Sequence, residues 1–195
     1  KDISSLSQYK ITNFNSTDQI LEKLLQNKII AVCRGKMEMG SRALGNRSII
    51  ADPRIRTNVE KINQLIKKRD FWMPFAPIVL EEYHALLLEN PKKIESPFMT
   101  IAFDTKDGRN KFPAGVHQAD GTARAQLLKK SQNPVLWDLI FKFYEKTKIP
   151  ALLNTSLNLH GEPIVNSVQD AIRVFEKSEL EVLWINNHII EKIKN

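Results

Sequence analysis

The sequence predicts a mixed α/β domain, and three observations support this. Helical and strand patterns alternate along all 195 residues. Apolar residues form 42% of the chain and charged residues 26%, which is the balance of a globular protein with a buried core. No internal repeat or low-complexity tract interrupts the alternation. This length is typical of one domain, so we expect residues 1–195 to fold as a unit.

The amino-terminal third begins with a helix and a buried strand. Ser16 opens an S-x-x-Q capping box, and the amphipathic helical sequence TDQILEKLLQN follows it. The apolar run KIIAVCRG comes next and ends at Gly35, as expected of a short buried strand. Residues 58–70 then place basic side chains on one side of a helix and apolar side chains on the other. These apolar residues are Val59, Ile62, Leu65 and Ile66.

The second half of the chain continues the alternation. Residues 96–108 predict a strand that runs into a turn. A helix is expected from Asn133 to about Lys146, because Pro134 suits the first helical position. The sequence PALLNTSLN begins at Pro150 and predicts a strand that enters a polar loop.

The carboxy-terminal part adds a further helix and strand. Ser167 and Asp170 form a capping box that starts the helical sequence AIRVFEKS. Residues 181–190 are typical of a strand followed by a turn. The weakest signals lie in residues 1–20 and 106–115, which we expect to be loop-like or mobile.

The composition limits the class of protein. Lys and Arg number 29 against 22 Asp and Glu, and the net charge of +7 favours an anionic partner such as a nucleotide, an acyl phosphate or a nucleic acid. No uninterrupted apolar run of about 18 residues is present, so no membrane span is expected. The single cysteine, Cys33, and the lack of a signal peptide predict a cytoplasmic protein. Because the chain begins at Lys1 rather than Met, we expect a fragment of a longer protein.

Four stretches carry the residue types of an anion-binding site, namely GKMEMGSRALGNRS, ADPRIR, DGTARAQ and NTSLNLHGEP. In the first stretch, Arg42 and Arg47 lie five residues apart. On a helix they would point about 140° away from each other. A loop made flexible by Gly40 and Gly45 would instead let both converge on one anion. We therefore predict a phosphate or carboxylate site in this stretch.

Each of these features also has a plainer interpretation. A single arginine is more often a surface ion-pair partner than a ligand contact, and Arg54 could pair with Asp52. NTSLN could be a turn held by local side-chain bonds. Glu38 would orient an arginine rather than bind a metal, and Cys33 is expected to be buried in its apolar strand. The histidines lack metal-ligand spacing and are expected to be structural or exposed; they are His84, His117, His160 and His188.

Taken together, the motifs resemble those of a known family. From about residue 29 to residue 186 the chain is similar to the carboxy-terminal domain of the NodU and antibiotic O-carbamoyltransferase family. The similar motifs, in family order, are GKMEMGSRALGNRSIIADPR, MPFAPIVLEE, SPFM, DGTARAQ, QNP and LLNTSLNLHGEPIV. The resemblance implies a YrdC-like α/β fold, a twisted mixed sheet flanked by helices. NTSLNLHGEP also resembles the T-S-x-N-x-x-G signature with which YrdC proteins hold a nucleotide.

The resemblance also implies a division of labour. In that family the YrdC-like domain is understood to combine carbamoyl phosphate and ATP into carbamoyl adenylate, with Mg²⁺ assisting. An amino-terminal actin-like domain that carries a metal then transfers the carbamoyl group to an acceptor hydroxyl. This chain contains nothing similar to that larger domain. The resemblance therefore implies the activation half of a carbamoyltransferase, which lacks transferase activity on its own.

Two positions depart from the family pattern. Met73 stands where an arginine is common, so one anion contact is absent or is supplied elsewhere. The family histidine usually lies two residues before the aspartate of DGTAR, which is Asp120 here. That position is Gln118, and His117 lies one step earlier. We therefore assign no proton transfer to His117.

Site roles follow from the residue types and the resemblance. Adenylation depends on placement and charge neutralisation more than on acid–base chemistry, so no catalytic histidine or carboxylate pair is required. We expect no metal-ligand set. The residues predicted to contact phosphate and carbamoyl groups are Lys36, Arg42, Arg47 and Arg124. Those predicted to hold the nucleotide are Asn154, Thr155, Ser156 and Asn158.

Two other functions stay open from the sequence. YrdC-like folds have been linked to double-stranded RNA, and a charge of +7 permits contact with a phosphate backbone. The charge is spread over helices instead of forming a basic run, however, which argues against nucleic acid. The other alternative is a non-catalytic domain that binds nucleotide and releases no pyrophosphate.

Overall fold

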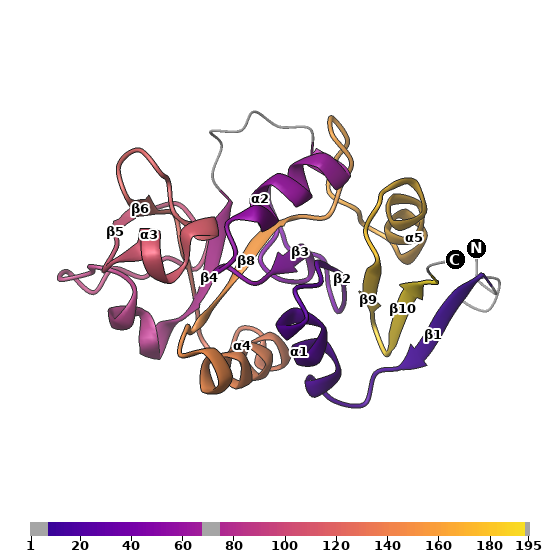
Figure 1. Cartoon of the computed structure of the whole chain (residues 1–195), viewed down its shortest axis with the longest axis horizontal. Helices are drawn as coiled ribbons and strands as arrows, with labels where there is room; N and C mark the ends of the chain where they lie inside the picture. Colours follow the sequence, from indigo (N-terminus) through magenta and orange to yellow (C-terminus); the bar gives the residue numbers. More distant parts are fainter. Residues whose placement is uncertain (1–7, 68–74, 194–195) are drawn as a thin grey trace.

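The computed structural model describes residues 8–67 and 75–193. Among these residues, an eight-stranded mixed sheet has the order β1-β10-β9-β2-β3-β8-β4-β7 (Figure 1). A separate two-stranded sheet contains β5 (Phe103–Asp104) and β6 (Thr122–Ala123). The strands of the large sheet are β1 (Tyr9–Asn13), β2 (Ile30–Cys33), β3 (Arg47–Ala51), β4 (Ala76–Leu80), β7 (Gln126–Leu128), β8 (Ala151–Ser156), β9 (Val182–Ile185) and β10 (His188–Lys192).

Helices cover both faces of the large sheet, with α1 and α4 on one side and α2 and α5 on the other (Figure 1). Because side chains alternate along a strand, Ile30 and Val32 of β2 face α1 and α4, whereas Ala31 and Cys33 face α2 and α5. β2 is therefore apolar on both faces. The helices are α1 (Asp18–Leu25), α2 (Thr57–Ile62, continued by a π-helical turn over Asn63–Lys67), α3 (Gly108–Lys111), α4 (Pro134–Thr147) and α5 (Val168–Lys177).

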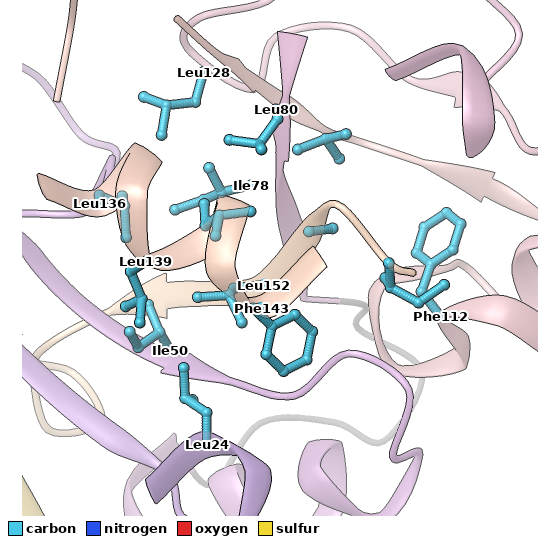
Figure 2. Packing of buried hydrophobic residues seen from close by; sticks show 14 of the residues in the cluster. Leu24, Ile50, Ile78, Leu80, Phe112, Leu128, Leu136, Leu139, Phe143 and Leu152 are labelled. Atoms are coloured by element: carbon cyan, nitrogen blue, oxygen red, sulfur yellow. The ribbon is translucent and has the colours of Figure 1, made fainter. Parts of the chain in front are cut away.

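The larger hydrophobic cluster lies between the sheet and α4. Leu136, Leu139 and Phe143 of α4 pack over Ile78 of β4 and Leu152 of β8 (Figure 2). All five side chains are at most 2% exposed. This packing fixes the position of the α4 amino terminus, which lies next to the site described below.

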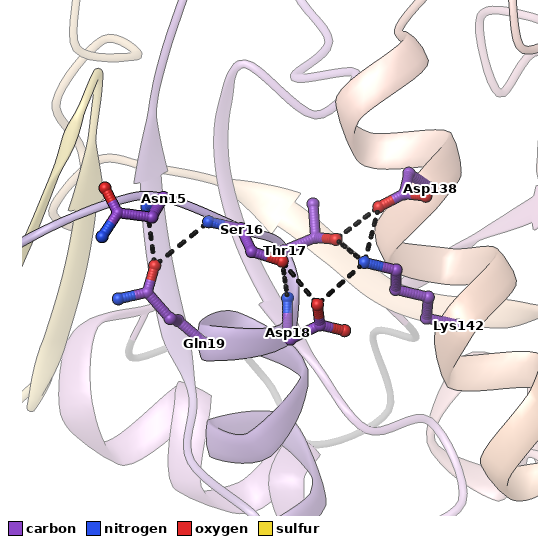
Figure 3. A network of polar contacts seen from close by, with 7 residues as sticks. All are labelled: Asn15, Ser16, Thr17, Asp18, Gln19, Asp138 and Lys142. Atoms are coloured by element: carbon purple, nitrogen blue, oxygen red, sulfur yellow. Dashed lines mark hydrogen bonds and ion pairs between the residues drawn. The ribbon is translucent and has the colours of Figure 1, made fainter.

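Polar contacts join α1 to α4 at the edge of this cluster. Lys142 Nζ lies 3.1 Å from Asp18 Oδ2 and 3.3 Å from Asp138 Oδ2 (Figure 3). The same ammonium group donates to Thr17 Oγ1, and the Thr17 hydroxyl donates to Asp138. These contacts raise the pKa of Lys142 through its hydrogen bond to Asp18 and lower the pKa of Asp18 through its bonds to Ser16 and Lys142.

The helix starts predicted from local caps are confirmed at α4 and α5 and in part at α1. The Asn133 side chain accepts from Leu136 N at the start of α4, and Ser167 with Asp170 forms a complete capping box at α5. Before α1, Gln19 Oε1 accepts from Ser16 N, which is one half of the predicted box. Within the described ranges, no helix has the length and apolar character needed to cross a bilayer.

One predicted strand and two segments predicted to be loop-like or mobile differ from the structure. The strand expected over residues 96–108 is reduced to β5, because Pro97 has no backbone N–H and Met99 has a φ of +56°. Residues 9–13, expected to be loop-like, form β1 and pair antiparallel with β10. That pairing depends on residues 188–192, which no local pattern could show. Residues 1–7 lie outside the described part of the chain, and residues 106–115 contain α3 and a 3-10 turn.

Candidate active site

One end of the large sheet brings together two of the predicted anion-binding stretches, GKMEMGSRALGNRS and NTSLNLHGEP. β8 runs antiparallel to both β3 and β4, so its carboxyl end lies beside the amino ends of these two strands. Asn154 pairs with Ala76 of β4, and Ser156 pairs with Ser48 of β3. The loop of residues 34–46, which connects β2 to β3, lies at the same end.

Glycines shape this 34–46 loop, as the sequence predicts. Gly40 has a φ of +103° and Gly45 a φ of +115°, a region that disfavours residues with a side chain. A Cβ at Gly45 would also lie 2.3 Å from Leu136 Cδ2 of α4. Gly45 is therefore required both for its conformation and for the close approach of the loop to α4.

Glu38 holds the loop backbone. Its Oε1 atom accepts from Leu44 N at 2.8 Å, from Asn46 N at 2.6 Å and from Arg47 N at 3.4 Å. Successive backbone N–H groups that point at one anion form the kind of concavity that also binds phosphate. Here the loop supplies its own carboxylate, so these N–H groups are already engaged. Glu38 therefore orients backbone and not an arginine side chain.

Arg47 does not converge with Arg42, which corrects the sequence prediction. It is only 7% exposed, and its guanidinium group donates to Arg34 O at 2.9 Å, Gly35 O at 3.2 Å and Asn166 O at 3.2 Å. A fourth bond reaches the carbonyl of Asn46. These carbonyls use the donors that a phosphate would need. Arg47 therefore stabilises the base of the loop.

Arg42 converges instead with Arg124. Both residues line a cavity of about 730 Å³, which we call the main cavity. Both also line a smaller hollow of about 90 Å³, which we call the inner recess. The remaining residues of the main cavity are Phe75, Ala76, Ala102, Gly115, His117, Asp120, Thr122, His160 and Gly161. Those of the inner recess are Ser41, Ala43, Phe75, Ala76, Met99, Asn154, Thr155 and Ser156.

The other predicted phosphate contact, Lys36, lies elsewhere. Its side chain is exposed, and it is absent from the residues that line the main cavity and the inner recess. Arg54 of the ADPRIR stretch pairs with Asp52, with Nη2 at 2.7 Å from Oδ2. The ion-pair interpretation of Arg54 is thus confirmed. Two arginines from distant parts of the sequence, Arg42 and Arg124, thus form the cationic wall.

The polar residues at the end of β8 and just after it fall into two groups. One group lines the inner recess, and the other holds a turn. Asn154, Thr155 and Ser156 line the inner recess, and they belong to β8 itself rather than to a loop after it. Asn158 does not line the recess. It accepts from the Ser156 hydroxyl at 2.6 Å and donates to Glu162 O at 2.7 Å. Asn158 therefore holds the turn after β8, and its predicted nucleotide contact stays a prediction.

The main cavity also contains three titratable residues that were not predicted from the sequence as site residues, namely His117, Asp120 and His160. Asp120 accepts from the backbone N–H of Thr122 at 2.9 Å and from its hydroxyl at 2.8 Å. His117 Nδ1 lies 3.0 Å from Asp120 Oδ1. The bonds from Thr122, followed by the effect of the neighbouring His117 side chain, lower the pKa of Asp120 to about 2. Asp120 is therefore a carboxylate across the working range of pH. Asp120 lies in the DGTARAQ stretch, so the sequence contained a signal for this carboxylate, although the prediction used only Arg124 from that stretch.

Two further sequence expectations have different outcomes. Cys33 is buried at 1% exposure, as expected, and desolvation raises the pKa of its thiol. Met73, the departure from the family arginine, lies outside the described residues.

Residues 21–192 match the family model described as the carbamoyltransferase C-terminus. The chain belongs to this family. An uncharacterised protein of Methanocaldococcus jannaschii is 44% identical over 194 residues, which cover 98% of this chain and 37% of that protein. Nodulation protein NolNO of Sinorhizobium fredii is 41% identical over 172 residues, 88% of this chain and 25% of NolNO. The 3'-hydroxymethylcephem-O-carbamoyltransferase of Amycolatopsis lactamdurans is 30% identical over 156 residues, 80% of this chain and 29% of that enzyme.

This carbamoyltransferase C-terminal chain thus spans between 25% and 37% of the length of these relatives. Among solved structures, full-length HypF in its phosphate- and nucleotide-bound form superposes with a TM-score of 0.55 at 13% identity, covering 87% of this chain and 21% of HypF. HypF of T. kodakarensis gives a TM-score of 0.52 at 17% identity, with the same coverage. These similarities establish the fold, and the predicted YrdC-like mixed sheet flanked by helices is confirmed.

Proposed function

We propose that this chain is the activation domain of a carbamoyltransferase, which binds carbamoyl phosphate and ATP and forms carbamoyl adenylate. The observation that carries the proposal is the convergence of Arg42 and Arg124 on one cavity beside the polar end of β8. Membership of the carbamoyltransferase family makes a carbamoyl donor the natural small ligand. A volume of about 730 Å³ is in the range of sites for small-molecule ligands.

The proposed reaction consumes carbamoyl phosphate, ATP and one water molecule, and it releases phosphate and pyrophosphate. Water first cleaves the bond between the phosphate and the carbamate. A carbamate oxygen then bonds to the α-phosphorus of ATP, while the bond from that phosphorus to the oxygen bridging to the β-phosphate breaks. Both substrates are polyanions, so their approach is opposed by repulsion. Arg42 and Arg124 reduce this repulsion and stabilise the charge that spreads over the phosphate oxygens.

Mg²⁺ would enter this site with ATP. Asp120 is the one carboxylate among the residues that line the main cavity, and the described residues hold no cluster of three His, Cys, Asp or Glu side chains suited to a metal. Mg²⁺ commonly keeps several waters and binds through one or two carboxylates together with substrate phosphates. The cavity fits that mode, with Asp120 as the protein ligand. The metal would neutralise phosphate charge.

The transfer step would belong to another part of the full protein. The relatives are about three to four times as long as the region matched here, since that region covers 25% to 37% of their length. We propose that an amino-terminal actin-like domain takes the carbamoyl group from the adenylate and delivers it to an acceptor hydroxyl. This chain alone would then show the activation half of the reaction without transfer.

Calorimetry of ATP–Mg²⁺ binding tests whether Arg42 and Arg124 contact the phosphate groups. A charge-assisted hydrogen bond contributes about 1.5–3 kcal/mol, so Arg42→Ala and Arg124→Ala should each weaken binding by roughly tenfold to a hundredfold. Lys146→Ala removes the same charge from an exposed position on α4 and should leave the affinity unchanged. Equal binding by the parent chain and both arginine variants would contradict the proposal, as would a parent chain that does not bind.

A further inference from the structure

The amide of Asn154 has a defined orientation. Its Nδ2 atom donates to Ala43 O at 2.8 Å. Because a carbonyl oxygen only accepts hydrogen bonds, the nitrogen must be the atom that faces Ala43. The Oδ1 atom is thereby assigned as an acceptor on the other side of the amide. Asn154 is 2% exposed, and Oδ1 finds no hydrogen-bond partner among the described residues.

An unpaired acceptor at this depth requires an explanation, because buried polar groups are nearly always hydrogen-bonded. Asn154 lines the inner recess together with Arg42 and Arg124. The recess therefore offers two cationic donor groups and one neutral acceptor that lacks a donor. A ligand that contacts both arginines and supplies the missing donor to Asn154 carries anionic oxygens together with an N–H group.

The size of the recess restricts this ligand further. Its volume of about 90 Å³ lies well below the roughly 300–1,000 Å³ of sites that enclose a whole small-molecule ligand. The adenine amino group of ATP is also an N–H donor, but a purine with its ribose does not fit in so small a space. A carbamoyl group of three heavy atoms does fit, with its phosphate directed toward the arginines.

We infer that Asn154 Oδ1 accepts a hydrogen bond from the amide N–H₂ of the carbamoyl group, and that the inner recess selects carbamoyl phosphate over acyl phosphates that lack an N–H. This inference rests on the proposed function and adds to it a residue that determines specificity. Asn154 changes from a nucleotide contact to a carbamoyl contact. The two arginines supply affinity for any acyl phosphate, and Asn154 supplies the discrimination.

Gln126 offers a matched control. Its Nε2 atom donates to Leu44 O at 3.2 Å, so it holds the carbonyl next to the one that Asn154 holds. It is 3% exposed, and its Oε1 likewise has no partner among the described residues. Gln126 is absent from the residues of the inner recess. Gln126→Ala therefore removes an equivalent contact to the loop without changing the proposed carbamoyl contact.

The test compares the binding of carbamoyl phosphate and acetyl phosphate by calorimetry. Acetyl phosphate has a methyl group in place of the amino group, with similar size and charge. The parent chain should prefer carbamoyl phosphate by about tenfold, as expected from one hydrogen bond to a buried acceptor. Asn154→Ala should bring this ratio close to one, and so should Asn154→Leu, which keeps the side-chain volume. Gln126→Ala should retain the parent ratio.

The outcomes separate this inference from the proposed function. A parent chain that binds both phosphates equally would overturn the carbamoyl contact while leaving the cationic site in place. Equal losses for both ligands in the Asn154 variants, with the ratio retained, would assign Asn154 a purely structural role and also overturn it. A parent chain that binds neither phosphate would contradict the proposed function itself.

Discussion

Two arginines from one glycine-rich segment have different environments at the scale of single residues. Arg42 is exposed and lines the main cavity, whereas Arg47 is 7% exposed and donates to backbone carbonyls. Their residue type and spacing gave no means of telling them apart. Three of the carbonyls that Arg47 contacts belong to the adjoining 34–46 loop, and the fourth, that of Asn166, comes from a segment more than a hundred residues later in the chain. Arg124 is likewise distant from Arg42 in the sequence, and the two residues line the same cavity only in the folded chain.

The role of Arg47 predicts a loss of stability on substitution. Arg47→Ala leaves several backbone carbonyls without their donor, so the free energy of unfolding should fall by about 3 kcal/mol. Arg42→Ala removes the same type of side chain from an exposed position and should change the free energy of unfolding by less than about 0.5 kcal/mol. Urea denaturation of the two variants measures the difference. Equal stabilities would contradict the structural role of Arg47.

The Asp120 carboxylate predicts a measurable titration. Its pKa in the folded chain is about 2, below the value of about 3.9 for an unfolded aspartate. A depressed pKa stabilises the folded state above pH 4, and that contribution is lost as the pH falls through about 2. Carboxyl NMR titration should give the low value, and Thr122→Val, which removes the hydroxyl donor, should raise it. A pKa near 3.9, or one that Thr122→Val leaves unchanged, would rule out this account.

At the scale of elements, the predictable parts are those specified by neighbouring residues. The cap at Asn133 and the capping box at Ser167 and Asp170 lie next to the helices they start, so the sequence predicted α4 and α5 correctly. β3 was not predicted, because it begins with buried Arg47 and Ser48, which are polar. β1 was not predicted because its partner strand is distant in sequence. Strand pairing over long separations therefore limits prediction here.

The turn after β8 is an element whose role can be tested. Asn158→Ala removes the bonds to Ser156 and Glu162, and a loss of about 1–2 kcal/mol should lower the melting temperature by about 2–8 °C. The increase in melting temperature caused by ATP–Mg²⁺ should stay at the parent value, because Asn158 lines neither the main cavity nor the inner recess. Ser167→Ala at the α5 cap is the control for a destabilising change away from the site. An unchanged melting temperature with a smaller ATP-induced increase would restore Asn158 as a nucleotide contact.

At the scale of the whole molecule, one end of the sheet combines segments that are far apart in sequence. The 34–46 loop, the amino end of β4, the 115–124 segment and the carboxyl end of β8 all contribute residues to one cavity system. The sequence could indicate which residue types form an anion site and that the fold is α/β. It could not show which of these residues meet, because that depends on the antiparallel placement of β8 beside β3 and β4.

The most direct test of the central proposal is the release of pyrophosphate from ATP by this chain in the presence of Mg²⁺. We predict release only when carbamoyl phosphate is also present, together with carbamoyl adenylate detectable by mass spectrometry. Arg42→Ala and Arg124→Ala should reduce the rate strongly, whereas Lys146→Ala should not. A chain that binds both substrates and releases no pyrophosphate would contradict the activation reaction and would instead be a nucleotide-binding module without turnover.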